Sequence, residues 1–362
     1  MRVPFVDLTR EWYSLEKELV DVFVAFGRSG QYVLGPYMER FETAFAEYCG
    51  YTYGMGVSTG LAALEVALRA YGVGPGDEVI TVGNSAVATA LAVSSVGATP
   101  IFCDIGTNFL MDPSKIEQHI TSKTKVILPV HLFGKICDMV SINAIAKKHG
   151  LVVIEDACQA HGAVWEGESA VNTKAFSFYP TKNLGAFGEG GMIVTNDERV
   201  KKFADAYRNY GQEGRYNHVH KGTNYRIHPL QCALMQIKLN TFDTFIEKRR
   251  IIAKKYIKDL STLSWLTLPE WDQSASYHLF VVRVKEEMRD NLKKYLEEQG
   301  IETLVHYPKT IYTQPWYGQE YANISLEMTE RYQKEILSLP CYPFLEMEEL
   351  QHVIDALLKY KE

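Results

Sequence analysis

Three short segments of the sequence carry residue types that can bind a charged group or do chemistry. The first is Ser58-Thr59-Gly60, which precedes an apolar stripe of helical spacing at Leu61, Leu64, Leu68 and Tyr71. The first N–H groups of a helix are unpaired and carry partial positive charge, so small residues there can hold a phosphate. The alternative is an ordinary helix cap made by Ser58 or Thr59.

The second segment is the run Leu151–Asp156, in which four apolar residues are followed by Glu155 and Asp156. A strand of this kind delivers its last side chains to the edge of a sheet, where ligands bind in α/β proteins. The alternative is structural, with Asp156 capping the next helix or forming an ion pair.

The third segment is residues 176–191, which read FSFYPTKNLGAFGEGG. It presents Lys182 in a dense apolar and glycine-rich setting, and lysine is rarely buried fully without a partner. Desolvation or nearby positive charge would lower the pKa of this lysine, as Schiff-base chemistry requires. The alternative is a solvated lysine in a loop.

Taken together, the three segments match the needs of pyridoxal 5'-phosphate. A lysine forms the Schiff base, a carboxylate keeps the pyridine nitrogen protonated, and a helix terminus holds the phosphate. Each segment alone favours a bland interpretation, whereas the combination predicts a pyridoxal phosphate site.

The elements that must position these segments alternate between strand and helix. Strands are expected at residues 78–82, 99–103, 126–130, 151–154, 175–179 and 192–195. Helices are expected at residues 10–29, 41–48, 61–71 and 141–149. Alternating strands and helices predict an α/β fold with a largely parallel sheet wrapped by helices.

The pattern changes near residue 240. A long basic helix is expected at Phe242–Leu260, followed by a β-like segment at 277–284, a helix at 287–299, a loop-rich region from His306 and a last helix at 348–360. We therefore expect a large domain over residues 1–240 and a small C-terminal α+β domain over residues 241–362.

Composition narrows the class of protein. The chain has 362 residues and a formal net charge of −6, which argues against a nucleic-acid binder. Six cysteines without a C-x-x-C pair favour free thiols in a reducing compartment, so a cytoplasmic location is expected. The uncharged stretch Val79–Cys103 is long enough to span a bilayer, but its glycines, serines and proline favour strand, buried helix and strand.

Longer motifs resemble the DegT/StrS-type sugar aminotransferases over nearly the whole chain. They are VPFVDL from Val3, GVGPGDEVI from Gly72, PVHLFG from Pro129, EDACQAHGA from Glu155, the lysine segment, GTNYRIHPLQCA from Gly222, HYP from His306 and SLPCYP from Ser338. The resemblance implies the aspartate-aminotransferase-like fold (fold type I of pyridoxal phosphate enzymes), with a mostly parallel seven-stranded sheet in the large domain.

The resemblance also implies roles for individual residues. Lys182 is similar to the catalytic lysine that joins the cofactor and moves protons, and Asp156 to the partner of the pyridine nitrogen. The remaining cofactor-binding positions are Gln159 near the ring hydroxyl, Thr59, Gly60 and Ser177 at the phosphate, and Asn224, which would reach a phosphate across a dimer interface. Positions on the substrate side are His306, Tyr307 and Glu189.

The activity implied by the resemblance is transamination. L-glutamate would give its amino group to pyridoxal phosphate, and the pyridoxamine phosphate so formed would aminate a nucleotide-linked keto-deoxy-hexose in aminosugar biosynthesis, such as that of lipopolysaccharide. The VPFVDL and HYP motifs favour amination at C3 of a dTDP- or UDP-linked 3-keto sugar, with C4 of a 4-keto-6-deoxy sugar as the alternative. A homodimer with shared active sites is expected, and neither nucleic acid nor membrane is expected as a partner.

Departures and competing hypotheses remain. Ala86 stands where the family commonly has an aromatic residue that stacks on the cofactor, and Thr223 replaces a frequent tyrosine. Lys182 argues against the branch in which histidine takes its place. A pyridoxal-phosphate-binding regulator without turnover is a second hypothesis. A nicotinamide-dependent oxidoreductase is a third, disfavoured because no G-x-G-x-x-G follows a strand. His218 and His220 lack a third metal ligand, so no metal is expected.

Overall fold

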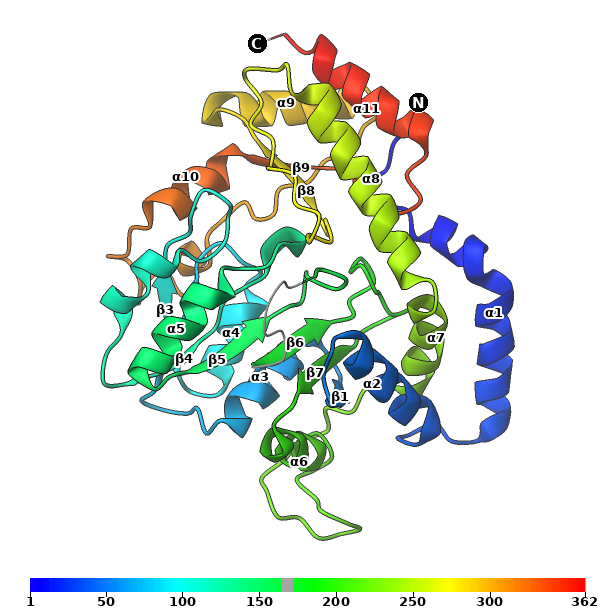
Figure 1. Cartoon of the computed structure of the whole chain (residues 1–362), viewed down its shortest axis with the longest axis vertical. Coiled ribbons are helices and arrows are strands. Elements are labelled where there is room, and N and C mark those ends of the chain that lie inside the picture. Colours follow the sequence, from blue (N-terminus) through cyan, green and yellow to red (C-terminus); the bar gives the residue numbers. More distant parts are fainter. Residues whose placement is uncertain (165–171, 362) are drawn as a thin grey trace.

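The computed structural model describes residues 1–164 and 172–361, and its centre is a seven-stranded sheet (Figure 1). The strand order is β1-β7-β6-β5-β4-β2-β3. The strands are β1 (Tyr53–Val57), β2 (Glu78–Val82), β3 (Thr99–Cys103), β4 (Thr124–Ile127), β5 (Val152–Asp156), β6 (Thr173–Ser177) and β7 (Gly191–Thr195). β7 runs antiparallel to β1 and β6, whereas the other neighbouring pairs are parallel. The predicted α/β fold with a mostly parallel sheet is confirmed.

Helices cover both faces of this sheet. One face packs against α3 (Gly60–Ala70), α4 (Ala88–Ser95) and α6 (Glu198–Tyr207). The other face packs against α2 (Pro36–Tyr48), α5 (Met139–His149) and α7 (Pro229–Leu239). Because side chains alternate along a strand, Ile154 and Ala175 lie in the α3 core while their neighbours Val153 and Phe176 lie on the opposite side.

A second core lies at the end of the molecule that holds both chain termini (Figure 1). The strands β8 (Phe280–Arg283) and β9 (Ile336–Leu339) pair antiparallel there. The helices α8 (Phe242–Leu260), α9 (Glu286–Glu298) and α11 (Met347–Lys359) pack around them. Val3 joins this core and pairs with Ile301, and α1 (Leu8–Ser29) then leads back to the sheet. The domain boundary at residue 240 stays a prediction.

Several elements have the predicted bounds, and others differ. The strands β2 and β3 and the helix α8 begin and end where expected. The stretch Val79–Cys103 forms strand, helix and strand as predicted, and across residues 1–164 and 172–361 none of the helices has the length and apolar character of a membrane span. The region after His306, predicted as loop-rich, also contains α10 (Glu327–Glu335) and β9.

One shifted boundary matters for the site. The strand predicted at 151–154 extends to Asp156, because Glu155 and Asp156 pair with Lys174 and Ala175 of β6. The strand predicted at 175–179 correspondingly ends at Ser177. Both acids therefore belong to the sheet itself, on opposite faces, and do not follow it in a loop.

Candidate active site

Asp156 is the last residue of β5 and lies on the α3 and α4 side of the sheet. Its side chain is buried, at 4% exposure, and both carboxylate oxygens are held. The Thr89 hydroxyl of α4 donates to Oδ2 at 2.7 Å, and the Cys158 amide donates to Oδ1 at 3.1 Å. The carboxylate is thus fixed in direction at the carboxyl end of a central strand.

Lys182 lies beyond the end of β6, in the loop that leads to β7. Burial lowers the pKa of Lys182 below its ordinary value, while neighbouring Cys158 and Asp156 act in the opposite direction. Its positive charge adds to the effect of burial on His306, whose pKa is lowered to about 4. The structure thus brings three predicted residues, Lys182, Asp156 and His306, into one electrostatic neighbourhood.

The predicted phosphate end is built by close contact between α3 and β6. Thr59 caps the helix, its hydroxyl accepting from the Ala62 amide at 3.0 Å. A Cβ atom at Gly60 would lie 2.6 Å from Ser177 Cβ and 3.0 Å from Cys158 Sγ. Glycine is therefore required for the helix N-terminus to approach Ser177 so closely. The cap made by Thr59 occupies one N–H and not the whole first turn, so it leaves other N–H groups for the predicted phosphate contact.

Gln159 links the predicted cofactor residues to the predicted substrate residues. Its Oε1 accepts from the Phe133 amide at 2.8 Å, and its Nε2 donates to the Tyr307 hydroxyl at 3.1 Å. Burial and the charge of Asp156 raise the pKa of Tyr307 to about 12, so this hydroxyl keeps its proton at neutral pH. Because the Tyr307 oxygen accepts from Gln159, its own O–H points elsewhere and is available to a ligand.

Two predicted residues lie apart from this group. Asn224 and Glu189 are exposed, and among the described residues neither forms a hydrogen bond or ion pair with the side chains around Lys182. Asn224 lies within the segment between α6 and α7, part of which projects from the body of the molecule (Figure 1). Within one chain, therefore, the structure assembles the predicted site without these two residues.

The other face of β5 carries a buried polar network that sequence reasoning missed. His131 Nδ1 accepts from the Cys137 amide at 3.2 Å, so its Nε2 carries the proton and donates to Glu155 Oε2 at 2.7 Å. Lys174 Nζ lies 3.2 Å from the same oxygen. Burial alone would raise the pKa of Glu155, but His131 and Lys174 bring it below its ordinary value. Glu155 thus stays ionised as a structural anion.

Thr89 is a second residue that sequence reasoning missed, since nothing in the local sequence marks a threonine in a buried helix as the partner of Asp156.

The predicted absence of a metal concerned His218 and His220. His218 Nδ1 hydrogen-bonds the Tyr210 carbonyl at 2.9 Å, and no group of three potential ligands gathers anywhere in residues 1–164 and 172–361.

Solved aminotransferase structures match the whole fold. DesV of S. venezuelae, solved in complex with a ketimine intermediate, has a TM-score of 0.96 and 39% identity, with all of both chains covered. NtdA from Bacillus subtilis, solved with bound cofactor PMP, has a TM-score of 0.95 and 35% identity, covering 99% of this chain and 84% of that one. With its half-buried lysine and its strand-end carboxylate, the protein is an aminotransferase that uses pyridoxal phosphate.

The sequence assigns this aminotransferase to one family. The sequence model of the DegT/DnrJ/EryC1/StrS aminotransferase family matches residues 14–358, and the chain belongs to that family. One relative, from Aneurinibacillus thermoaerophilus, is named dTDP-3-amino-3,6-dideoxy-alpha-D-galactopyranose transaminase and is 43% identical over 99% of both chains. The family predicted from the motifs is thereby confirmed.

Proposed function

We propose that the protein moves an amino group from L-glutamate to the keto group of a nucleotide-linked deoxysugar, with Lys182 as its catalytic residue. The observation that carries this proposal is the placement of a desolvated lysine beside a carboxylate whose two oxygens are both held. Within the described chain, Lys182 Nζ has no hydrogen bond or ion pair of its own, which leaves the amine free to react.

The residues around Lys182 fit pyridoxal phosphate. When bound, this cofactor supplies an aldehyde that takes up an amine and a ring that withdraws electrons. The tight junction at Gly60 and Ser177, with Thr59, would hold the phosphate at the N-terminus of α3. Asp156 would pair with the ring nitrogen and Gln159 would lie at the ring hydroxyl.

Burial of Lys182 sets its part in the reaction. A lowered pKa raises the fraction of neutral amine, which is both the nucleophile and the base. In the first half-reaction, Lys182 Nζ takes a proton from the carbon that bears the donor's amino group. In the second half-reaction, it gives a proton to the sugar carbon that receives the amino group. Neutral His306 and protonated Tyr307 present hydrogen-bonding groups without adding charge beside the lysine.

The finer assignments concern the substrate and the assembly. Amination at C3 of a dTDP- or UDP-linked 3-keto sugar is supported by the name of the A. thermoaerophilus relative. His306, Tyr307 and Glu189 would contact this substrate. Asn224 would complete the phosphate site of a second subunit in a homodimer, which agrees with its exposure in the single chain.

The first experiment is the visible absorption spectrum of the protein with pyridoxal phosphate, before and after L-glutamate. We expect a band from the cofactor joined to lysine, its loss on addition of glutamate, and no such band in Lys182→Ala. The matched control is Lys147→Ala, an exposed lysine of α5. Failure of the native protein to take up cofactor would overturn the proposal, and uptake without turnover on any keto sugar would indicate a regulator.

The second experiment fixes the position of the new amine. The protein, glutamate and matched 3-keto and 4-keto nucleotide sugars are incubated, and the products are analysed by NMR. Amination of the 3-keto sugar alone is expected, and preference for the 4-keto sugar would refute the C3 assignment.

A further inference from the structure

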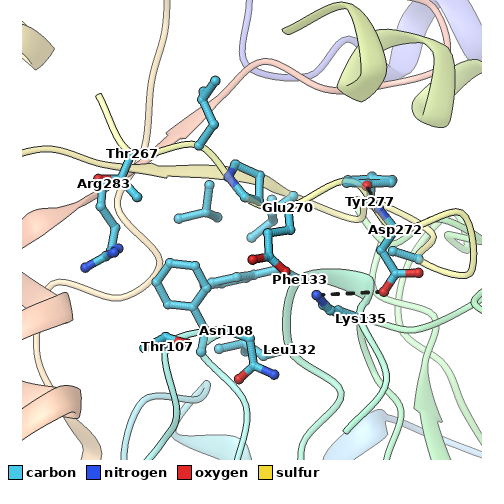
Figure 2. A pocket seen from close by; sticks show the side chains of 16 residues that line it. Thr107, Asn108, Leu132, Phe133, Lys135, Thr267, Glu270, Asp272, Tyr277 and Arg283 are labelled. Carbon is cyan, nitrogen blue, oxygen red and sulfur yellow. Dashed lines mark hydrogen bonds and ion pairs between the residues drawn. The ribbon is translucent and has the colours of Figure 1, made fainter. Parts of the chain in front are cut away.

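A cavity of about 230 Å³ lies outside the group around Lys182. Its walls come from two parts of the chain, the loops after β3 and β4 and the segment from Thr267 to Arg283 (Figure 2). None of the residues assigned above to cofactor or substrate lines it. The cavity is smaller than the pockets of drug-sized ligands, which suits a compound with one ring.

The floor of the cavity is apolar and its rim is polar. Phe109 and Phe133 meet edge to face with ring centroids 5.4 Å apart, and Val281 continues this floor. Thr107 and Asn108 are exposed at the rim. A floor of aromatic rings with a few polar groups at the edge fits a ring that has an apolar face and a polar perimeter.

Of the charged side chains that line the cavity, one carboxylate has no ion pair among the described residues. Lys135 pairs with Asp272 at 3.8 Å, and Arg283 pairs with Glu335 at 3.1 Å. Glu270 has neither an ion pair nor a hydrogen bond among residues 1–164 and 172–361, and its carboxylate points into the space beside Phe133 (Figure 2). Glu270 is exposed at the edge of the cavity, and its carboxylate can pair with a positively charged group of a ligand.

The cavity shares a residue with the support of the active site. Phe133 lines the cavity, while its amide donates to Gln159 Oε1, and Gln159 in turn donates to Tyr307. Phe133 has a φ of 61°, a left-handed conformation that costs energy for a residue with a side chain. A ligand that packs on this ring would favour one position of the amide that orients Gln159.

We propose that this cavity is a second binding site, for a single-ring primary amine of aminosugar size, and that its occupation is felt at Gln159 and Tyr307. The ring lies over Phe109 and Phe133, and the ammonium group pairs with Glu270. Binding in this cavity does not require the chemistry at Lys182, so the failure of either proposal leaves the other standing.

The test measures binding of D-glucosamine to the full-length protein by calorimetry, with D-glucose as the uncharged comparison. We expect glucosamine to bind and glucose to bind at least tenfold more weakly. Glu270→Gln should weaken glucosamine binding at least fivefold, and Glu270→Lys should reverse the preference towards D-glucuronate. Glu298→Gln, an exposed carboxylate on α9, is the matched control and should change nothing.

Two further variants separate this cavity from the active site. Thr107→Trp should fill the cavity and abolish binding, whereas Lys182→Ala should leave glucosamine binding unchanged. Loss of binding in Lys182→Ala with retention in Glu270→Gln would overturn the proposal, because the sugar would then occupy the active site. No binding of glucosamine to the native protein would also overturn it.

The link to the active site has its own readout. A 3-fluorotyrosine at position 307 gives one ¹⁹F NMR signal, which should shift when glucosamine binds and stay fixed in Glu270→Gln. Binding without any shift would refute the link.

Discussion

The two faces of β5 place neighbouring carboxylates in opposite circumstances. Asp156 lies on the side of α3 and α4, held by a neutral hydroxyl and an amide, with a desolvated lysine nearby. Glu155 lies on the other side, with a histidine, an amide and a lysine around it. The comparison teaches that an acid paired with a buried lysine and further donors is structural, while an acid oriented only by a hydroxyl and an amide remains free to pair with a ligand.

The largest expected effect separates the two acids by activity. Asp156→Asn should lower kcat/KM on the order of 10³-fold, because an amide in the proposed position beside the ring nitrogen would no longer keep that nitrogen protonated. Glu155→Gln should lower it less than tenfold in the folded enzyme. Steady-state kinetics with glutamate and a keto sugar measures both, and equal losses would erase the distinction between the faces.

The order of the two substitutions should reverse for stability, with Glu155→Gln destabilising the protein more than Asp156→Asn. Glu155→Gln removes the anion from a buried network with His131 and Lys174, and we expect a loss of about 3 kcal/mol in the free energy of unfolding. Asp156→Asn should cost about 1 kcal/mol. Urea unfolding of the two variants decides this, and a Glu155→Gln protein as stable as the native one would contradict the structural role.

A third effect concerns acid stability on the Glu155 face. His161 is buried among Phe45, Phe176 and Phe178, and burial first, then the charge of Lys182, lowers its pKa to about 3. The unfolded chain binds this proton near pH 6.5, so the native state loses stability as pH falls from there towards 3.

His161→Phe removes this dependence of stability on pH, because it replaces the imidazole with an aromatic ring that does not titrate. Between pH 7 and pH 5 the native protein should lose about 2 kcal/mol more unfolding free energy than the variant. Urea titrations at the two pH values measure the difference, and parallel losses would show that His161 does not titrate as its burial implies.

The smallest effect tests the holding of Asp156. Thr89→Val removes the hydroxyl from Oδ2 while keeping the shape of the side chain, and kcat/KM should fall about tenfold. Thr89→Ser keeps the hydroxyl and should retain most of the activity. A Thr89→Val enzyme with native kinetics would show that Cys158 alone orients the carboxylate.

Local pattern predicted the parts of the fold that depend on local chemistry. The strands β2 and β3 and the helix α8 follow directly from apolar runs and periodicity. The strand β1 was missed because Gly54 and Gly56 interrupt its pattern. Tertiary packing requires glycine at both positions. A Cβ atom at Gly54 would lie 2.4 Å from the Glu42 carbonyl oxygen, and one at Gly56 would lie 2.4 Å from Ile227 Cγ2.

The site also contains residues that the sequence predicts and contacts that only the fold creates. Lys182, Asp156 and Gly60 were marked by motif and setting, and the structure gathers them. The contact between Gln159 and Tyr307 joins residues 148 apart, and the Thr89 contact with Asp156 spans 67, so no local pattern could reveal either. The roles of Asn224 and Glu189 stay predictions, because both residues are exposed and, among the described residues of one chain, neither forms a hydrogen bond or ion pair with the side chains around Lys182.

The two cores exchange pieces of chain. Val3, at the start of the sequence, is buried in the C-terminal core, while Tyr312, Tyr317 and Tyr321 from the C-terminal part pack on Phe102 of the sheet. A cut near residue 240 would therefore leave each half with a hole that the other half fills. Heat should melt both cores in a single cooperative transition, so in folding, unlike in architecture, the molecule behaves as one unit.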